Sequence, residues 1–464
     1  DAVSLLDKNS VDLVRFYFMW KSSPIEPISF SVKEMVGRPY QIISTLYYLH
    51  VYYKQNSEYD KFTYDETILQ SIFHSGHLST PDIWILTKLE KLITNTTSLL
   101  DACRFHEASR LIEEFIITSL SQTYVPLVRY DLWNDEEKNR SRRFAIYAVL
   151  SVCLKNVDVL LHPFSPFTTD FLYLSCFKRY DTILMDGWSN REFLRMVSSN
   201  DVESAFDIVK DVASMSFSVR NKSKLKRRWP LESAYLYCKN IDFLKVKGIK
   251  DILLDQLNIQ NISIHSIEYD SVIDKILTLM ENNAPITPKI DINRKIVAKK
   301  VKSDIGPLMD EFSKMDVIQS LHDIKKNGFL TCKYSDSKSI ELGVSDLEVK
   351  YLPLENYMHI EKEDILLIID VSRNDELITK GMVRDLSRNI QQLRKELGFN
   401  PTEILSCAFI SNISEDEIEH LVRYYEDIKN LVRVKDVVFS VIPDNKFDHK
   451  TIDIDGKEIK IYIH

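Results

Sequence analysis

Residues 220–231 combine a dense run of basic side chains with a tryptophan. The segment reads Arg-Asn-Lys-Ser-Lys-Leu-Lys-Arg-Arg-Trp-Pro-Leu, and six of its first nine residues are basic. Such a density attracts a polyanion, because neutralised phosphates release their counterions, and an indole ring can stack on an unpaired base at roughly 1 to 3 kcal/mol. The alternative is a solvated basic turn with its tryptophan packed on a neighbouring domain. We predict contacts with single-stranded or looped RNA from Arg220, Lys222, Lys224, Lys226, Arg227, Arg228 and Trp229.

A second basic feature lies on the helix that we predict over residues 375–397. Its apolar residues recur at spacings of three and four, which is typical of a core-facing seam. Lys380, Arg384 and Arg388 follow one another four residues apart on another face of the same helix. A plain solvated face is one reading of this stripe, and contact with a nucleic-acid groove is the other. We take these three cations as further candidate RNA contacts.

A third basic cluster precedes Asp304 and contains no acid. Its members are Arg294, Lys295, Lys299, Lys300 and Lys302. Contact with nucleic acid is again possible here, beside the reading of a solvated helix face.

Side chains for catalysis or metal binding form no convincing set. His74 and His77 have a metal-like spacing, but no third ligand of a matching kind lies nearby. The six cysteines are spread singly, which indicates reduced, buried thiols in a cytosol. No two of the 10 glycines are closer than 15 residues, so Gly-rich phosphate loops and the nucleophile elbow are excluded. We predict neither a catalytic residue nor a metal ligand in this chain.

The elements that must position these basic clusters change character along the chain. From residue 30 to residue 219 the apolar periodicity is helical, and Ser79-Thr80-Pro81-Asp82 is a typical helix start. Long helices are predicted over residues 99–121 and 414–428, a linker over residues 281–288, and a hairpin turn at Asp455-Gly456. No internal repeat is evident. The predicted fold class is multidomain α plus α/β, in which an all-α helical bundle precedes small mixed α/β domains.

Length and composition agree with a soluble protein of several domains. The chain has 464 residues, 44% of them hydrophobic, 11% aromatic and 28% charged. Its net charge of 60 − 68 = −8 argues against a bulk polycation, so an anionic partner must be held by local patches. It has no uncharged apolar run long enough to span a bilayer, and no membrane partner is expected. Because the sequence opens at Asp1, we expect a piece of a longer protein.

Three segments in the first half resemble one protein family. Ser10-Val11-Asp12-Leu13-Val14-Arg15-Phe16-Tyr17, the helix over residues 81–89, and Pro163-Phe164-Ser165-Pro166-Phe167 followed by Asp170 are similar to motifs of class I aminoacyl-tRNA synthetases for branched aliphatic amino acids. Gln122-Thr123-Tyr124 departs from the Arg-Trp-Tyr that is common in that family. We therefore carry over no role for that turn.

The second half narrows the resemblance. Its basic segment before Pro230-Leu231, and the run from Lys380 to Lys395, are similar to the C-terminal part of isoleucyl-tRNA synthetases. The coiled coil typical of valyl enzymes and the cysteine-ligated zinc element of bacterial isoleucyl enzymes are both missing from the sequence. The resemblance therefore points to the archaeal and eukaryotic type.

The resemblance implies a division of the chain and a function. Residues 1–29 would end the connection to a catalytic domain, 30–219 would form the anticodon-binding domain, 220–284 a small junction domain, and 285–464 a C-terminal mixed α/β domain. The ATP-handling signatures His-Ile-Gly-His and Lys-Met-Ser-Lys-Ser are absent. The chain would bind tRNA(Ile) in the cytoplasm, without a cofactor and inactive alone. Catalytic and editing domains on the same or a separate chain would use ATP and Mg²⁺.

Three other readings stay open. The chain could be a stand-alone tRNA- or RNA-binding protein derived from a synthetase, the equivalent region of a valyl-tRNA synthetase, or a purely structural helical interaction protein. Complementation by an N-terminal half, and salt-sensitive binding of tRNA, would separate them.

Overall fold

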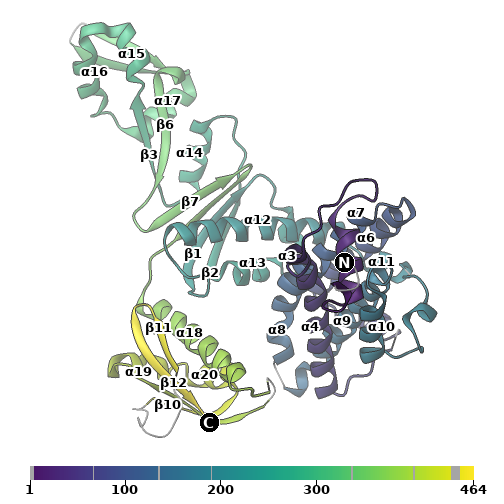
Figure 1. Ribbon diagram of the computed structural model, residues 1–464. Helices are drawn as coiled ribbons and strands as arrows, with labels where there is room; N and C mark the ends of the chain where they lie inside the picture. The colour runs from purple at the N-terminus through teal and green to yellow at the C-terminus, as the bar shows by residue number, and fades with distance from the viewer. Residues whose placement is uncertain are drawn as a thin grey trace. The chain divides into compact units, whose positions relative to one another are not determined.

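The computed structural model describes residues 5–65, 67–133, 136–189, 191–335, 338–400, 403–439 and 450–464. By contacts between its residues, the chain divides into two compact units. The first comprises residues 1–208 and 243–249, and the second comprises residues 209–242 and 250–464. The predicted fold class is confirmed, because the first unit is helical and the second contains small mixed sheets (Figure 1). The division into four domains stays a prediction.

The first unit is a bundle of helices. Its helices are α2 (Val11–Lys21), α3 (Val32–Met35), α4 (Arg38–Tyr59), α5 (Ile68–His74), α6 (Thr80–Asp101), α7 (Phe105–Glu114), α8 (Val125–Trp133), α9 (Arg140–Leu161), α10 (Pro166–Cys176), α11 (Glu192–Val197) and the first part of α12 (Asn200–Lys222). The predicted start of α6 is confirmed, because Ser79 and Asp82 form a capping box.

Helix α9 forms the centre of the bundle. It is buried along most of its length, from Ala145 to Leu161. By length and composition, the stretch Glu137–Leu161 is the one helical segment among the described residues that could cross a membrane. In this structure 78% of its apolar window is buried inside the protein, as in the core helix of a bundle.

The single helix predicted over residues 99–121 is wrong. Helix α6 ends at Asp101, Cys103 has a φ of 56°, and α7 begins only at Phe105. A left-handed residue reverses the chain and ends a helix, which the apolar periodicity cannot reveal. Cys103 is also exposed rather than buried, unlike Cys153 in the bundle core. A π-helical segment, Phe115–Tyr124, follows α7.

Two of the three segments that carried the family resemblance in the first half, residues 10–17 and 163–170, are in contact. Asp12 is buried in α2 and accepts a hydrogen bond of 2.5 Å from the Thr168 backbone N–H. Phe16 packs edge-on against Phe164, with ring centroids 6.4 Å apart. The Pro-Phe-Ser-Pro-Phe turn therefore fixes α2 on the bundle.

The second unit begins with a four-stranded sheet in the order β2-β1-β8-β7. Its strands are β1 (Leu231–Cys238), β2 (Ile259–Ser266), β7 (Tyr357–Lys362) and β8 (Ile365–Asp370), and α13 (Ile249–Leu257) connects the parallel pair β1 and β2. Strand β8 pairs antiparallel with β1, and β7 with β8.

Residues between β2 and β7 form an arm with its own apolar core (Figure 1). The arm contains α14 (Val272–Glu281), β3 (Ile286–Ile292), α15 (Arg294–Val301), α16 (Ile305–Phe312), α17 (Val317–Asn327), β4 (Phe329–Ser335), β5 (Lys338–Gly343) and β6 (Leu347–Pro353). The linker predicted over residues 281–288 is wrong, because Ile286–Ile292 pairs with β6 and Pro288 lies within that pairing. Proline is tolerated there because its missing N–H falls on an edge strand.

The C-terminal part of the unit repeats the sheet topology. Strands β9 (Leu405–Ser411), β10 (Val434–Phe439), β11 (Lys450–Ile454) and β12 (Lys457–Ile463) have the order β10-β9-β12-β11, and α18 (Asp375–Glu396), α19 (Glu415–Val422) and α20 (Tyr425–Val432) accompany them. The predicted hairpin is confirmed, because Asp455 and Gly456 both have positive φ between β11 and β12. The helix predicted over residues 414–428 is two helices, since α19 ends at Val422.

The two four-stranded sheets of the second unit are copies of one structural repeat, which the sequence did not reveal. In each copy a long helix precedes two parallel strands, which are connected by α13 in the first copy and by α19 and α20 in the second, and a hairpin then adds two antiparallel strands. The correspondence extends to single contacts. Arg220 binds carbonyl oxygens 6, 9, 37 and 38 residues further on, and Arg394 binds those 6, 9, 38 and 39 residues further on. The arm is thus an insertion into the first copy.

Candidate nucleic-acid interface

The basic segment forms the end of α12 and the turn that leads into β1. Lys224, two residues beyond the helix, has a φ of 56°, and the Leu225 N–H donates to the Arg220 carbonyl oxygen at 2.8 Å. This backbone closes the helix and sends the chain into the sheet. The same turn closes α18, where Gly398 has a φ of 79° and the Phe399 N–H donates to the Arg394 carbonyl oxygen at 3.0 Å.

Arg220 is buried, and its guanidinium is committed to the fold. Its two terminal nitrogens donate to the carbonyl oxygens of Trp229 at 2.7 Å and Leu257 at 2.8 Å, and more weakly to those of Lys226 and Asn258. Burial, with repulsion from two neighbouring arginines, lowers the pKa of Arg220 to about 10, so it stays charged at neutral pH. We therefore withdraw Arg220 from the candidate RNA contacts.

Trp229 is also buried, which agrees with the alternative reading of this residue. Its indole N–H donates to the Asp385 carboxylate at 3.1 Å, and Gly381 lies against the ring. The guanidinium carbon of Arg373 lies 5.0 Å from the ring centroid, which is a cation–π contact. With only 2% of its surface exposed, Trp229 has no face left for an RNA base, and we withdraw it as a stacking group.

Asp385 joins the basic segment to α18. Besides Trp229, it pairs with the Lys226 ammonium at 3.1 Å and with Nε of Arg228 at 2.7 Å, although the carboxylate itself is buried. Arg384 adds a hydrogen bond of 3.1 Å to the Arg228 carbonyl oxygen and another to the Asn258 side chain. A single carboxylate faces two cations here, so the cluster keeps a net positive charge.

Four of the predicted cations are exposed and uncommitted. Within the described residues, Lys222, Lys224, Arg227 and Arg388 have neither an ion pair nor a side-chain hydrogen bond, whereas Lys380 pairs with Glu376 one helical turn away. Arg384 is exposed as well and borders the same segment. We call the exposed cations Lys222, Lys224, Arg227, Arg384 and Arg388 the basic rim.

A comparison of the two copies of the repeat shows which residues the turn after the long helix needs in order to form. The positions of the second copy that correspond to Lys222, Lys224 and Lys226 hold Glu396, Gly398 and Asn400. The second copy builds the same turn around Arg394 without these cations. Lys222 and Lys224 are therefore not needed to form this turn, which favours a role for them in binding an anion.

Sequence reasoning missed the residues that hold the interface together. Asp385 and Gly381 lie inside the predicted helix and were read only as part of the resemblance. A glycine within a strongly periodic helix was the available signal, because it often marks a close approach of another chain segment. Asn258 also holds the segment in place, because its side-chain amide donates a hydrogen bond to the Arg227 carbonyl oxygen at 3.0 Å. The sequence around Asn258 gave no comparable signal.

Comparison with known proteins identifies the region that contains this segment. Residues 82–235 match the family model described as the anticodon-binding domain of tRNA ligase, and the match includes the whole basic segment. Residues 82–235 are thus similar to the anticodon-binding domain of tRNA ligases. The family resemblance predicted for helix α6 and for the basic segment is thereby confirmed.

Known isoleucine–tRNA ligases are similar to almost the whole chain. The enzyme of Saccharolobus solfataricus is 25% identical over 94% of this chain, that of Archaeoglobus fulgidus 25% over 98%, and that of Clostridium tetani 25% over 100%. The chain spans 40 to 42% of the length of these relatives. The predicted likeness to the C-terminal part of an isoleucyl-tRNA synthetase is confirmed, and the valyl alternative is disfavoured.

Proposed function

We propose that this chain binds the anticodon arm of an isoleucine-accepting tRNA within an isoleucine–tRNA ligase. The observation that carries the proposal is the basic rim, which lies within and beside a segment that matches the anticodon-binding domain of tRNA ligases. The similarity of nearly the whole chain to isoleucine–tRNA ligases supports isoleucine tRNA as the RNA that is bound.

The proposed role is one of gripping and positioning. Lysine and arginine side chains on phosphates fix the register of an RNA without reading its sequence. Because Trp229 is buried, stacking on an unpaired base falls to the exposed guanidinium planes of Arg384 and Arg388.

Chemistry belongs to other parts of the proposed enzyme. ATP-dependent aminoacylation, with ATP and Mg²⁺, would be carried by catalytic and editing domains on the same or a separate chain, in the cytoplasm. An editing step is expected because isoleucine and valine differ by one methylene, which binding alone discriminates weakly. This chain would hold the anticodon arm so that the acceptor end reaches those domains.

Salt dependence of binding tests the proposal. Fluorescence anisotropy with labelled isoleucine tRNA should show an affinity that falls steeply with salt, because each cation on a phosphate displaces a counterion. Replacing Lys222, Lys224 and Arg227 together by Gln should reduce the slope of log K against log salt by about 2 to 3. The variant should lose a similar factor in affinity for all tRNAs, because phosphate contacts carry no sequence information.

A matched variant controls for total charge. Lys239, Lys326 and Lys333 are exposed, and replacing them by Gln removes the same three charges elsewhere in the second unit. The control variant should keep the wild-type slope. Equal slopes for the wild type and the basic-rim variant would show that the rim is an ordinary solvated surface, and the proposed interface would be wrong.

A further inference from the structure

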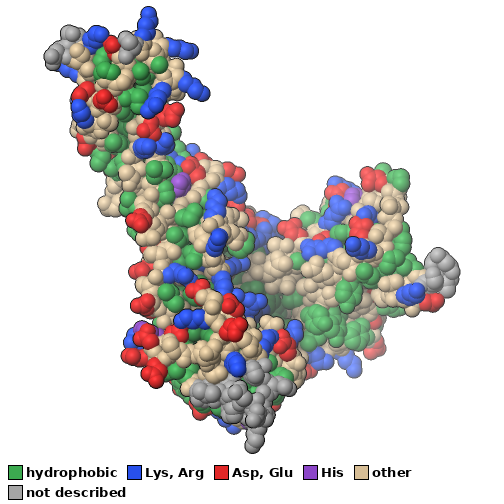
Figure 2. Space-filling view, turned by 60° about the vertical axis from the view of Figure 1, so that its left-hand side comes forward, with side chains coloured by type: hydrophobic (Ala, Val, Ile, Leu, Met, Phe, Trp, Pro, Cys, Tyr) green, Lys and Arg blue, Asp and Glu red, His purple; other side chains and the backbone are tan. Residues whose placement is uncertain are grey.

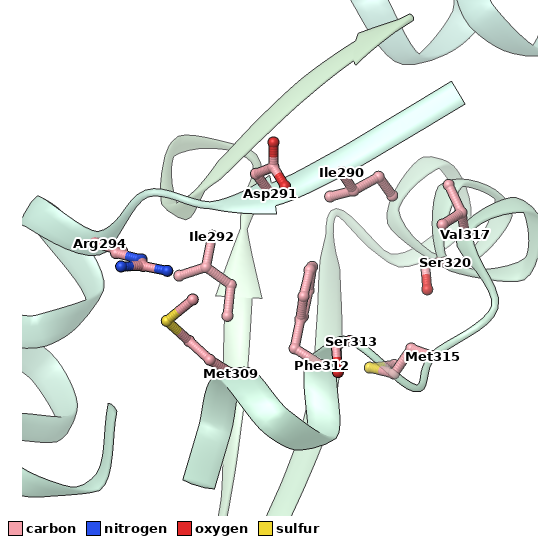
Figure 3. A pocket seen from close by; sticks show the side chains of 10 residues that line it. All are labelled: Ile290, Asp291, Ile292, Arg294, Met309, Phe312, Ser313, Met315, Val317 and Ser320. Carbon is pink, nitrogen blue, oxygen red and sulfur yellow. The ribbon is translucent and has the colours of Figure 1, made fainter. Parts of the chain in front are cut away.

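The inserted arm contains a pocket that the proposed function does not use. It measures about 280 Å³ and lies between β3 on one side and α16 with the start of α17 on the other (Figure 3). Phe312 stands in the middle of the lining side chains and points toward the strand that carries Ile290 and Ile292, while Met309 lies beside Ile292. The remaining lining residues are Asp291, Arg294, Ser313, Met315, Val317 and Ser320.

The polar groups of the pocket are already satisfied, with one exception. The Ser313 hydroxyl donates to the Asp310 carbonyl oxygen at 2.8 Å and the Ser320 hydroxyl to that of Asp316 at 2.6 Å. Asp291 pairs with Lys350 at 3.0 Å and with Lys289 at 3.4 Å. Arg294 is exposed at the mouth, and within the described residues its guanidinium has no partner.

This chemistry favours an apolar group over a nucleobase. The edge of a base carries several donors and acceptors, and each costs about 1 to 3 kcal/mol when it is buried without a partner. An aliphatic or aromatic side chain has no such cost and gains from burial against Met309, Phe312 and Ile290. The walls of the pocket therefore fit the side chain of a peptide.

The surface beside the pocket is strongly basic. On α15, which begins at Arg294, Lys295 and Lys299 lie four residues apart and share one face of the helix, and Lys302 follows directly after the helix ends at Val301. All three are exposed and without an ion pair in the described part of the chain, whereas Lys300 pairs with Asp346. Figure 2 shows Lys and Arg side chains gathered at the end of the arm.

We propose that the arm binds an acidic peptide segment of a partner protein, with one large apolar side chain of that segment in the pocket. Arg294 and the lysines of α15 would pair with the flanking carboxylates, which supplies the charge complementarity that a neutral or basic peptide lacks. A buried apolar anchor surrounded by polar contacts is the usual organisation of such an interface. The second copy of the repeat folds without an arm at this place, so the insertion is free to serve binding. This proposal does not depend on tRNA binding.

Methyl NMR on the full chain reads the pocket directly. With methionine methyl groups labelled and the probe peptide Glu-Glu-Asp-Leu-Leu-Asp-Glu-Glu added, we expect saturable shifts of the Met309 and Met315 signals. Met309→Leu and Met315→Leu assign these two signals. Replacing both leucines of the probe by alanine should weaken binding about tenfold or more, because the buried apolar surface is lost. Replacing its acids by glutamine should weaken binding and remove its salt dependence.

Two variants localise the site on the protein. Ser313→Trp should fill the exposed mouth and abolish the shift of Met315, with an unchanged thermal transition. Lys295→Glu combined with Lys299→Glu should weaken binding at least tenfold, because like charges then face the acidic peptide. Lys326→Glu combined with Lys333→Glu makes the same charge change at two exposed lysines of the arm outside the pocket, and it should leave the affinity unchanged.

The opposite results are equally clear. Absence of Met309 and Met315 shifts up to about 1 mM probe, the weak limit of specific binding, would overturn the proposal. An unstructured oligoribonucleotide that shifts these two methyl signals more strongly than the peptide would assign the pocket to RNA and overturn it as well. If Ser313→Trp fails to fold, the charge-reversal pair and its control still decide the outcome.

Discussion

Gly381 of α18 lies against the indole ring of Trp229, so close that a β-carbon at position 381 would come within 2.5 Å of Trp229 Cδ2. The nearest ring atoms belong to a side chain that is buried and hydrogen-bonded to Asp385, so the ring has little freedom to move away. This contact, together with the Asp385 cluster, sets where the basic segment sits on the helix.

Replacing Gly381 by alanine should therefore destabilise the second unit. We expect a loss of about 1 to 3 kcal/mol, typical of overpacking in a closed contact. Thermal or urea unfolding measures it. Gly343 at the end of β5 is the matched control, because its backbone is extended (φ −76°, ψ 170°) and a β-carbon there would meet only Asp346 Oδ2, at 3.9 Å. Gly343→Ala should therefore be neutral or stabilise the protein by up to about 1 kcal/mol. A neutral Gly381→Ala would show that Trp229 is not held as described.

The repeat predicts that two arginines act alike on stability. Arg220 and Arg394 each spread their planar guanidinium over four carbonyl oxygens in a buried site, and a lysine ammonium cannot reproduce that fork. Arg220→Lys and Arg394→Lys should each cost about 2 to 4 kcal/mol in urea unfolding, since carbonyl oxygens are left unpaired. A loss of tRNA affinity by Arg220→Lys without a loss of stability would contradict the structural role.

A buried pair in the first unit should make its stability depend on pH. His50 and Asp158 are both buried, and His50 Nε2 lies 2.9 Å from the Asp158 carboxylate. Burial disfavours the imidazolium, but Asp158 outweighs it, and the pKa of His50 is raised. Burial also raises the pKa of Asp158. Both groups therefore hold their proton more tightly in the folded state, and both pKa shifts make the folded state less stable as the pH rises.

The stabilisation from His50 is complete below its unfolded pKa of about 6.5 and is lost as the pH rises through the higher folded pKa. Calorimetry from about pH 5.5 to about pH 8.5 should show the advantage of the wild type over the double variant His50→Gln with Asp158→Asn, which removes both titrating groups, shrinking as the pH rises. His74→Gln, at an exposed histidine, should show no such trend. An advantage that grows with pH would contradict the charged pair.

Arg388 should contribute to the choice among tRNAs. It is exposed on α18 and free of partners in the part of the chain that the structure describes, so its guanidinium can meet an unpaired base. Arg388→Gln should lower the preference for isoleucine tRNA over methionine tRNA by about tenfold in competition binding. If both Arg388→Gln and Arg384→Gln leave that preference unchanged, α18 is structural and the bases are read elsewhere, most directly by the bundle helices.

Local signals could be predicted from the sequence, and distant contacts could not. The Ser79–Asp82 capping box and the Asp455-Gly456 turn depend on neighbouring residues, and both are as predicted. The burial of Trp229 depends on Asp385, 156 residues away, and no periodicity reveals that distance. The repeat stayed hidden for a related reason. Arg220 and Arg394 bind backbone carbonyl oxygens, which leave no residue pattern in the sequence.

The basic segment shows how this limit affects function. Six basic residues looked equivalent in the sequence, yet Arg220 is buried, and Lys226 and Arg228 pair with Asp385. The remaining three, Lys222, Lys224 and Arg227, are exposed and unpaired among the described residues. Composition locates a charged segment, whereas only the tertiary structure separates cations that serve the fold from those that can meet a ligand.

Binding of tRNA fragments tests the central proposal most directly. The anticodon stem-loop and the acceptor minihelix of isoleucine tRNA carry similar phosphate charge, so a non-specific polycation would bind both alike. The account predicts that the stem-loop binds the chain with an affinity close to that of the whole tRNA, and that the minihelix binds at least about tenfold more weakly. Equal binding of the two fragments, or a preference for the acceptor minihelix, would contradict an anticodon-arm grip.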